Sequence, residues 1–248
     1  MNVVSEPIVR KKLSDEVFAR LKHMIETGEL KAGDDMPSER ELMERYGVGR
    51  PAIREAMQAL AGKGLVEISQ GERAKVLRIT AESIIRQVDL PAKLMLSGSS
   101  DTLEHLKSAR IFFERGMIRE AAAKASPAHI AALRALLDKQ KESLGDADAF
   151  IDADMEFHQL IARISGNPIF AAVSGAMLGW LKSYHTEMLI WTGRENFTLA
   201  EHEEIIRAIE KGDADLAEKA MIKHLERSRA LYALKGRNKV QNTTSTVP

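Results

Sequence analysis

The sequence predicts a mainly α-helical protein in which an N-terminal winged helix-turn-helix precedes an all-helical antiparallel bundle. The chain of 248 residues is long for one domain, so two domains are the better expectation. A pattern of helix, tight turn, helix and hairpin lies between Pro37 and Arg78. After Asp101, apolar residues recur at helical spacing with almost no strand signal. We therefore expect a flexible arm at residues 1–10, the winged domain at 11–80, the helical domain at 81–235 and a disordered tail at 236–248.

The composition excludes several classes of protein. Because there is no Cys, neither a disulfide framework nor a thiolate metal site can form. No apolar run is of the signal-peptide type or long enough to span a bilayer, which favours a cytoplasmic protein with no membrane partner. The 36 basic and 36 acidic side chains cancel. Any binding to nucleic acid must then depend on where the arginines lie rather than on surplus positive charge.

The first helices are predicted from the residues at their ends. Ser14 can cap a helix that runs to about Thr27. Ser38, with Glu41 three residues later, predicts a capping box at the start of the next helix. Gly47 is expected to end that helix, because glycine readily adopts the left-handed conformation found there.

The helix that follows carries the residues that indicate DNA binding. Pro51 suits its first turn. Its buried face is expected at the spacing i, i+3, i+4 and i+7, which is occupied by Ile53, Ala56, Met57 and Leu60. Arg50 and Arg54 lie on a different face near its start, where the DNA-reading side chains of a helix-turn-helix are found. The alternative is an ordinary helical hairpin with solvated arginines.

The rest of the chain predicts a wing and then a bundle. Two short strands are expected at 65–69 and 74–79, around a turn at Gln70 and Gly71. Short turns between long amphipathic helices then favour an antiparallel bundle. About seven helices are expected, at 81–96, 102–124, 128–144, 147–165, 168–191, 198–211 and 213–234.

Four polar side chains interrupt the apolar faces of these helices. Asp154 and His158 lie one turn apart on the same helix, while His202 and His224 lie on the inner faces of two others. One buried His is more often a hydrogen-bonded core residue, but four such residues would need four separate partners. A divalent metal would satisfy all of them. One oxygen and three nitrogen ligands suit Zn, and also Ni, Mn or Fe.

Arg110 is a further polar residue on an apolar stripe, between Leu106 and Phe113. A buried arginine needs an acceptor. It can pair with Glu114 one turn on, or it can face a cavity and bind a ligand carboxylate through its forked guanidinium. In the second case, the metal and the guanidinium together would bind a small organic acid.

These residues resemble those of a known family. The matching N-terminal motifs are Pro37-Ser-Glu-Arg-Glu-Leu, Arg50, Arg54-Glu55-Ala56 and Gly62-x-Gly64-Leu65, which are similar to the GntR-type winged helix. The helical remainder, with Asp154-x-x-x-His158, His202 and His224, resembles the FCD-type ligand-binding domain of the FadR subgroup. The resemblance covers about residues 11–234.

The resemblance implies a homodimeric transcription regulator, with repression of a catabolic operon as the expected action. Its partners would be double-stranded operator DNA and a small organic acid such as an acidic sugar. The positions that match DNA contacts are Arg40, Arg50, Arg54, Gln70 and Gly71. The positions that match metal ligands, with Zn expected, are Asp154, His158, His202 and His224. Arg110 matches an arginine at the effector pocket.

Two other interpretations compete with this one. A site of His and Asp can activate water, as in a metal-dependent hydrolase with an accessory winged-helix domain, although no general base is apparent beside the predicted ligands. Alternatively, the bundle is a dimerisation module and the metal is purely structural.

Overall fold

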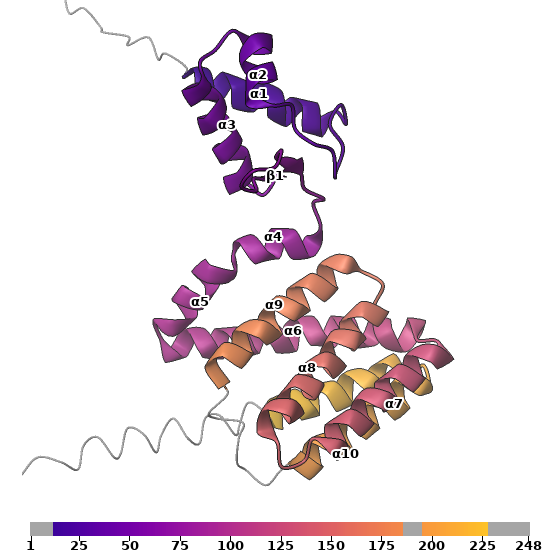
Figure 1. The fold of residues 1–248 in the computed structure, drawn as a ribbon. Coiled ribbons are helices and arrows are strands. Elements are labelled where there is room, and N and C mark those ends of the chain that lie inside the picture. The colour runs from indigo at the N-terminus through magenta and orange to yellow at the C-terminus, as the bar shows by residue number, and fades with distance from the viewer. Residues whose placement is uncertain (1–11, 186–194, 228–248) are drawn as a thin grey trace, which may run out of the picture. The chain divides into compact units, whose positions relative to one another are not determined.

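The computed structural model describes residues 12–185 and 195–227 (Figure 1). The chain divides into two compact units, with the boundary between Gln87 and Val88. Each unit has a hydrophobic core of its own. The arm predicted at residues 1–10 and the tail predicted at 236–248 lie outside the described residues.

The first unit is a winged helix-turn-helix, which confirms the predicted fold. Its elements are α1 (Leu13–Glu26), α2 (Glu39–Tyr46), α3 (Arg50–Gly62), β1 (Val66–Glu67), β2 (Lys75–Val76) and α4 (Ala81–Gln87). The two strands pair in antiparallel fashion, with Val66 opposite Val76. Each strand is only two residues long, shorter than the predicted 65–69 and 74–79. The turn between them includes Gln70 and Gly71, as expected.

Local capping interactions set the geometry of the helix-turn-helix. The Ser38 hydroxyl accepts a hydrogen bond from the Glu41 backbone N–H at 3.3 Å, and the Ser38 N–H donates to the Glu41 carboxylate at 2.7 Å. This reciprocal pair is the predicted capping box. Gly47 ends α2 with a φ of 64°, in the left-handed region that glycine adopts without steric cost. The chain can therefore turn sharply into α3.

The prediction that Ser14 caps the first helix is wrong. Helix α1 begins at Leu13 with Lys12 at the N-cap, and the Lys12 carbonyl accepts from the backbone N–H groups of Asp15 and Glu16. Ser14 therefore lies within the first turn, where it is buried. Its hydroxyl has no hydrogen-bond partner among the described residues.

The predicted helix at 81–96 is in fact two helices, α4 and α5 (Asp89–Ser97), separated at Val88. Pro91 explains the break. Proline has no N–H to donate to the carbonyl four residues earlier, which belongs to Gln87, and its ring clashes with that carbonyl. A proline is tolerated in the first turn of a helix, so α5 restarts just before it.

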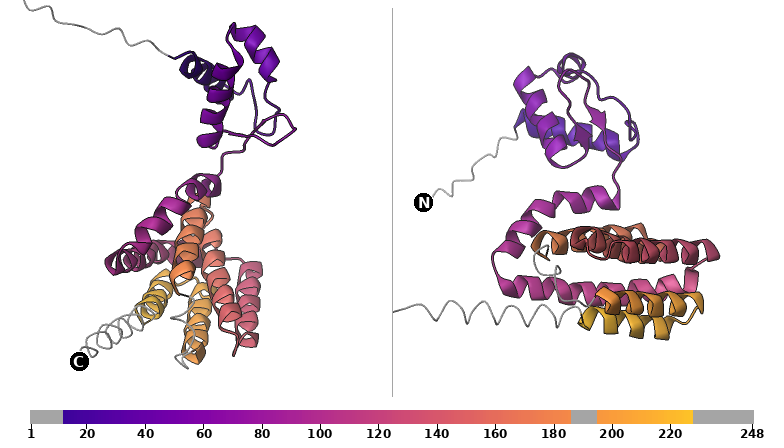
Figure 2. Two further views of the ribbon diagram at one scale, coloured as in Figure 1. Left: turned by 60° about the vertical axis from the view of Figure 1, so that its left-hand side comes forward. Right: turned by 60° about the horizontal axis from the view of Figure 1, so that its bottom comes forward.

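The second unit is the predicted all-helical antiparallel bundle. After α5 it contains α6 (Ser100–Lys124), α7 (Pro127–Glu142), α8 (Ala147–Ile164), α9 (Pro168–His185) and α10 (Glu195–Glu210), followed by a helical segment over residues 214–227. Helix α6 packs against α8, α9 and α10, and α7 packs against α8 and α10. The right-hand view in Figure 2 shows α6 between α9 and α10. No helix in the described part of the chain is long and apolar enough to cross a membrane.

The main core of this unit surrounds α8. Phe157, Ile161 and Ile164 of α8 pack with buried residues of α6, α7, α10 and the segment 214–227. Burying one large aliphatic or aromatic side chain contributes about 1.5–3 kcal/mol. The core thus holds α6, α7, α10 and the segment 214–227 around the inner face of α8, where the polar residues of the candidate site lie.

Candidate metal centre

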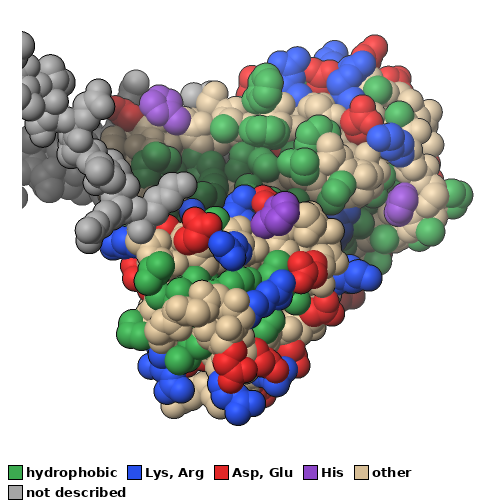
Figure 3. Space-filling model, turned by 90° about the horizontal axis from the view of Figure 1, so that it is seen from above, with side chains coloured by type: hydrophobic (Ala, Val, Ile, Leu, Met, Phe, Trp, Pro, Cys, Tyr) green, Lys and Arg blue, Asp and Glu red, His purple; other side chains and the backbone are tan. Residues whose placement is uncertain are grey.

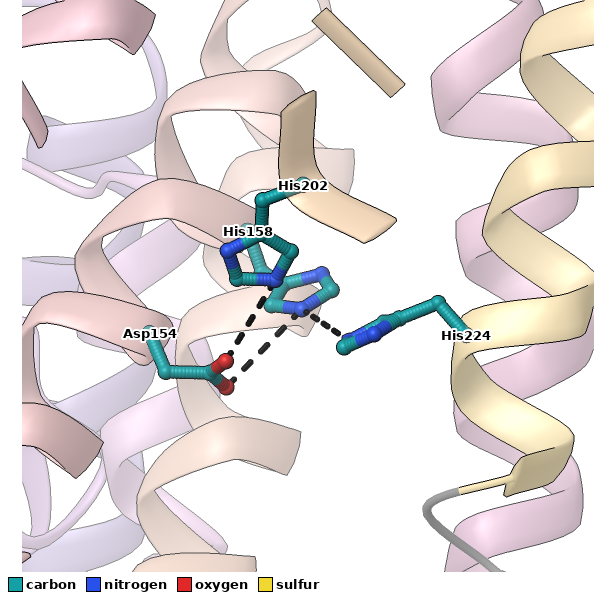
Figure 4. Close-up of side chains that lie close together, drawn as sticks. All are labelled: Asp154, His158, His202 and His224. Carbon is teal, nitrogen blue, oxygen red and sulfur yellow. Dashed lines mark hydrogen bonds and ion pairs between the residues drawn. The ribbon is translucent and has the colours of Figure 1, made fainter. Parts of the chain in front are cut away.

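The structure brings together all four residues that the sequence predicted as metal ligands. Figure 4 shows Asp154 and His158 on α8 pointing toward His202 of α10 and His224 of the segment 214–227. One ligand atom from each residue lies within 4.8 Å of the others. The three histidines are buried and Asp154 is half-buried. The one-turn spacing of Asp154 and His158 places both on the inner face of α8.

The ligand atoms that converge are the histidine Nε2 nitrogens and the Asp154 oxygens. His158 Nε2 lies 3.2 Å from His224 Nε2. Asp154 Oδ1 lies 3.4 Å from His202 Nε2, and Asp154 Oδ2 lies 3.9 Å from His158 Nε2. Phe157 stacks on the His202 ring with centroids 4.1 Å apart, which fixes the plane of that imidazole.

Two buried carboxylates bind the outer nitrogens of two of these histidines. Glu114 Oε2 lies 2.5 Å from His158 Nδ1, and Glu201 Oε2 lies 2.9 Å from His224 Nδ1. From the sequence, Glu114 was expected only as a partner for Arg110, and Glu201 was not predicted. The signal for Glu201 was its position immediately before His202 on the same helix.

Both carboxylates are held in the ionised form. Burial raises the pKa of Glu114, but the charges of Arg110 and His158 and their hydrogen bonds outweigh it and lower the pKa to about 2. Burial likewise raises the pKa of Glu201, whereas hydrogen bonds from His224 and Arg227 lower it to about 2. An ionised carboxylate can only accept hydrogen bonds. The Nδ1 atoms of His158 and His224 therefore donate to these carboxylates, and in the neutral form of each ring Nε2 carries the free lone pair.

Gln140 sets the same tautomer for His202. Its side-chain nitrogen donates to Asp154 Oδ1 at 3.3 Å, so its amide oxygen is the atom that lies 2.8 Å from His202 Nδ1. His202 Nδ1 then donates to that oxygen, and Nε2 again carries a lone pair. Burial holds the pKa of His202 well below its ordinary value. The imidazole is consequently neutral, as a metal ligand must be.

This arrangement fits a divalent cation. His202 Nε2 is buried and has no hydrogen-bond partner among the described residues. His158 Nε2 and His224 Nε2 face each other at 3.2 Å. Leaving a buried nitrogen such as His202 Nε2 unsatisfied costs about 1–3 kcal/mol. A cation among three imidazole nitrogens and one carboxylate would satisfy them all, and outer partners such as Glu114 and Glu201 usually accompany histidine ligands.

Arg110 takes the first of the two positions that the sequence allowed. Its Nε donates to Glu114 Oε1 at 2.5 Å, and only a small part of its side chain is exposed. It therefore lies behind His158, a predicted metal ligand, to which Glu114 links it. A role for Arg110 in effector binding stays a prediction.

The predicted DNA-contacting residues lie on the surface of the first unit. Arg50 and Arg54 at the start of α3 are exposed and both approach Glu39 of α2. Arg40 is exposed and lies 3.8 Å from Glu44 on the same helix. Gln70 and Gly71 are exposed at the turn of the wing. Figure 3 shows basic and acidic side chains interspersed over the visible face, with no single basic patch.

The chain joins a winged helix-turn-helix, which has exposed arginines on α3, to a helical bundle with a candidate ligand-binding centre. This is the architecture of a ligand-responsive transcription regulator. Residues 13–76 match the model of the gntR family of bacterial regulatory proteins. Residues 105–227 match the FCD domain. The chain belongs to the GntR family and carries an FCD domain, as the sequence resemblance predicted.

Curated relatives match nearly the whole chain. The HTH-type transcriptional repressor NanR of Cronobacter sakazakii is 43% identical over 223 residues, which is 88% of this chain and 85% of that protein. The NanR repressor of Escherichia coli K12 is 41% identical over 226 residues, 90% of this chain and 86% of that protein. Among solved structures, Streptococcus agalactiae GntR matches with a TM-score of 0.63 at 24% identity, covering 88% of this chain and 99% of that one, which supports the fold. Because these proteins are regulators of transcription, the hydrolase interpretation has no support.

Proposed function

We propose that this regulator is a homodimeric repressor whose affinity for operator DNA is set by a small organic acid bound at a metal centre. The observation that carries the proposal is the convergence of three histidine Nε2 nitrogens with Asp154, where the buried Nε2 of His202 has no hydrogen-bond partner among the described residues. Asp154, His158, His202 and His224 would hold the metal. Zn is our first choice, with Ni, Mn or Fe as alternatives that the same ligands accept.

The metal would act as a positive anchor for the effector. When bound, it supplies a Lewis-acidic charge that attracts a carboxylate. The protein ligands provide the tautomers and the buried environment that keep this charge effective. Asp154 is the half-buried member of the set, so a small molecule would approach the centre from the side of Asp154. An acidic sugar is the proposed effector, in keeping with the family resemblance.

The DNA-binding part of the proposal concerns the first unit. Arg50 and Arg54 would read base edges in the major groove, where a bidentate arginine on guanine is the commonest specific contact. Arg40 would contact phosphate, and Gln70 and Gly71 would approach the minor groove. Two chains bound to two half-sites would double these contacts without raising the charge of each chain. The protein would act in the cytoplasm, where bacterial operator DNA lies.

Metal analysis combined with a thermal-shift screen tests the metal and effector together. The purified protein should contain about one divalent ion per chain and should melt at a lower temperature after chelation. His202→Ala should lose the ion, whereas His105→Ala should keep it because His105 is an exposed residue of α6. A sugar acid should raise the melting temperature only when metal is present, and a neutral hexose should not.

The outcomes separate the alternatives. Stabilisation by metal with no response to any organic acid would support the purely structural metal instead. Protein that takes up no metal under any loading condition would remove the metal from the proposal.

A further inference from the structure

One acidic side chain bridges the two arginines of the DNA-reading helix. Glu39 is the first residue of α2, and its Oε1 lies 2.9 Å from Arg54 Nε. Its Oε2 lies 3.4 Å from Arg50 Nε. The two arginines are one turn apart at the start of α3, so a single carboxylate spans both. The Glu39 side chain is 38% exposed, compared with 63% for Arg50 and 67% for Arg54.

Because Glu39 contacts the Nε atom of each arginine, the two terminal nitrogens of each guanidinium remain for DNA. Both use the Nε atom, which lies on the side of the fork nearest the chain. The two terminal nitrogens are the pair that can donate side by side to O6 and N7 of guanine. Holding Nε against Glu39 limits the rotation of two long side chains before DNA arrives, so less conformational entropy is lost when they bind.

The negative charge of Glu39 affects the attraction of the protein to DNA phosphates, which does not depend on the base sequence. Residues 1–80 carry 14 basic and 13 acidic side chains, so attraction to the DNA backbone is weak from the outset. Attraction to phosphates is independent of sequence and dominates binding to non-operator DNA. A carboxylate between the two arginines reduces this attraction to phosphates at the point where the recognition helix meets DNA. Base-edge hydrogen bonds depend on position and are less affected by a single nearby charge.

The Glu39 contacts contribute little to folding. Exposed ion pairs add little to the stability of a folded protein, because water and salt screen the two charges. The capping box of α2 uses Ser38 and Glu41 rather than Glu39. Substitution of Glu39 should therefore leave the unit folded.

We propose that Glu39 is a specificity-determining residue of the DNA-reading surface: it positions Arg50 and Arg54 for base contacts and lowers their affinity for non-operator DNA. The inference rests on the proposed reading of operator DNA by Arg50 and Arg54. Glu39 is a positioning residue in this scheme and need not touch DNA.

The test compares two duplexes with the full-length protein. One is a sequence that the wild-type protein selects from a randomised pool, and the other is a shuffled duplex of the same composition. Fluorescence anisotropy at several salt concentrations gives the ratio of the two affinities. Glu39→Gln should lower this ratio about tenfold, the loss expected from one misplaced base contact. It should also strengthen binding to the shuffled duplex and steepen its salt dependence.

Two further variants separate position from charge. Glu29→Gln is the matched control, because Glu29 is an exposed acid of the same unit, 3.3 Å from Arg45. It makes the same charge change and should alter the ratio less than about twofold. Glu39→Asp keeps the charge but has a shorter reach, so the ratio should fall while binding to the shuffled duplex stays at the wild-type value.

The results distinguish this inference from the proposed function. If Glu39→Gln and Glu29→Gln change the ratio equally, or if neither changes it, Glu39 has no role in specificity. If Arg54→Ala nevertheless weakens binding to the selected duplex, the proposed recognition helix stands without Glu39. If Arg54→Ala leaves that binding intact, the recognition helix is wrong and the inference falls with it.

Discussion

Glu114, Glu201 and Gln140 contact the outer nitrogens of the three clustered histidines. Among substitutions of these residues, Glu114→Gln should disturb the candidate metal centre most. Glu114 is buried on α6 between Arg110 Nε at 2.5 Å and His158 Nδ1 at 2.5 Å. Glutamine has nearly the same shape but carries no charge. It leaves the Arg110 guanidinium with no ionised partner at this position. It also no longer requires His158 Nδ1 to be the protonated nitrogen, because an amide can donate as well as accept.

The expected loss of stability follows from this geometry. Removing one partner of a buried ion pair typically destabilises a protein by about 3–5 kcal/mol. The lowering of the Glu114 pKa from 4.5 to about 2 corresponds to roughly 3 kcal/mol of preference for the ionised form, which agrees in order of magnitude. Affinity for the metal should fall by about 10- to 100-fold, as is usual when an outer partner of a histidine ligand is lost.

Two measurements check these values. Urea unfolding of the chelated protein gives the stability without metal, and competition with a chromogenic chelator gives the metal affinity. Glu120→Gln is the control, because Glu120 is an exposed acid on the same helix that pairs with Lys124 one turn on. That change should cost only about 0.3–0.5 kcal/mol. Equal, small losses for both variants, with unchanged metal affinity, would refute the role assigned to Glu114.

Three further substitutions test other parts of the structure. Hydrogen bonds from Arg115 and Arg119 hold the pKa of Glu218 below its ordinary 4.5. The stability that these hydrogen bonds confer is therefore present above about pH 4.5 and is lost as the pH falls below that value. Glu218→Gln should accordingly be less stable than wild type at neutral pH and converge on it in acid, whereas a constant gap in pH-dependent unfolding would contradict this. Ser38→Ala should lower the unfolding free energy by about 1 kcal/mol through loss of the capping box, and no loss in urea unfolding would show that the cap is dispensable. Ser14→Ala should be neutral or stabilising by up to about 1 kcal/mol because the buried hydroxyl has no partner in the described structure, and a marked loss of stability would reveal a partner.

Features that depend on neighbouring residues could be predicted from the sequence. The capping box joins Ser38 to a residue three positions away, and Gly47 ends α2 through its own backbone preference. The apolar spacing of α3 likewise leaves Arg50 and Arg54 exposed without reference to the rest of the chain. The helix break at Val88 was also a local signal, but the prediction overlooked the effect of Pro91 on the carbonyl of Gln87.

The cluster of Asp154, His158, His202 and His224 could be predicted because each of them interrupts an apolar stripe. Their partners could not be found in the same way. Gln140 reaches His202 across 62 positions, and Glu114 reaches His158 across 44. Only the packing of α6, α7, α8 and α10 decides which helix faces which. Periodicity within a helix does not contain that information.

X-ray absorption spectroscopy of the zinc-loaded protein would identify the ligands of the metal. We expect a single class of site with three imidazole nitrogens at about 2.0–2.1 Å and carboxylate oxygen at about 2.0–2.2 Å. Addition of a sugar acid should change the oxygen shell and leave the three imidazoles in place. A spectrum with fewer than three imidazole ligands, unchanged in the His202→Ala variant, would show that the metal binds elsewhere and would contradict the account.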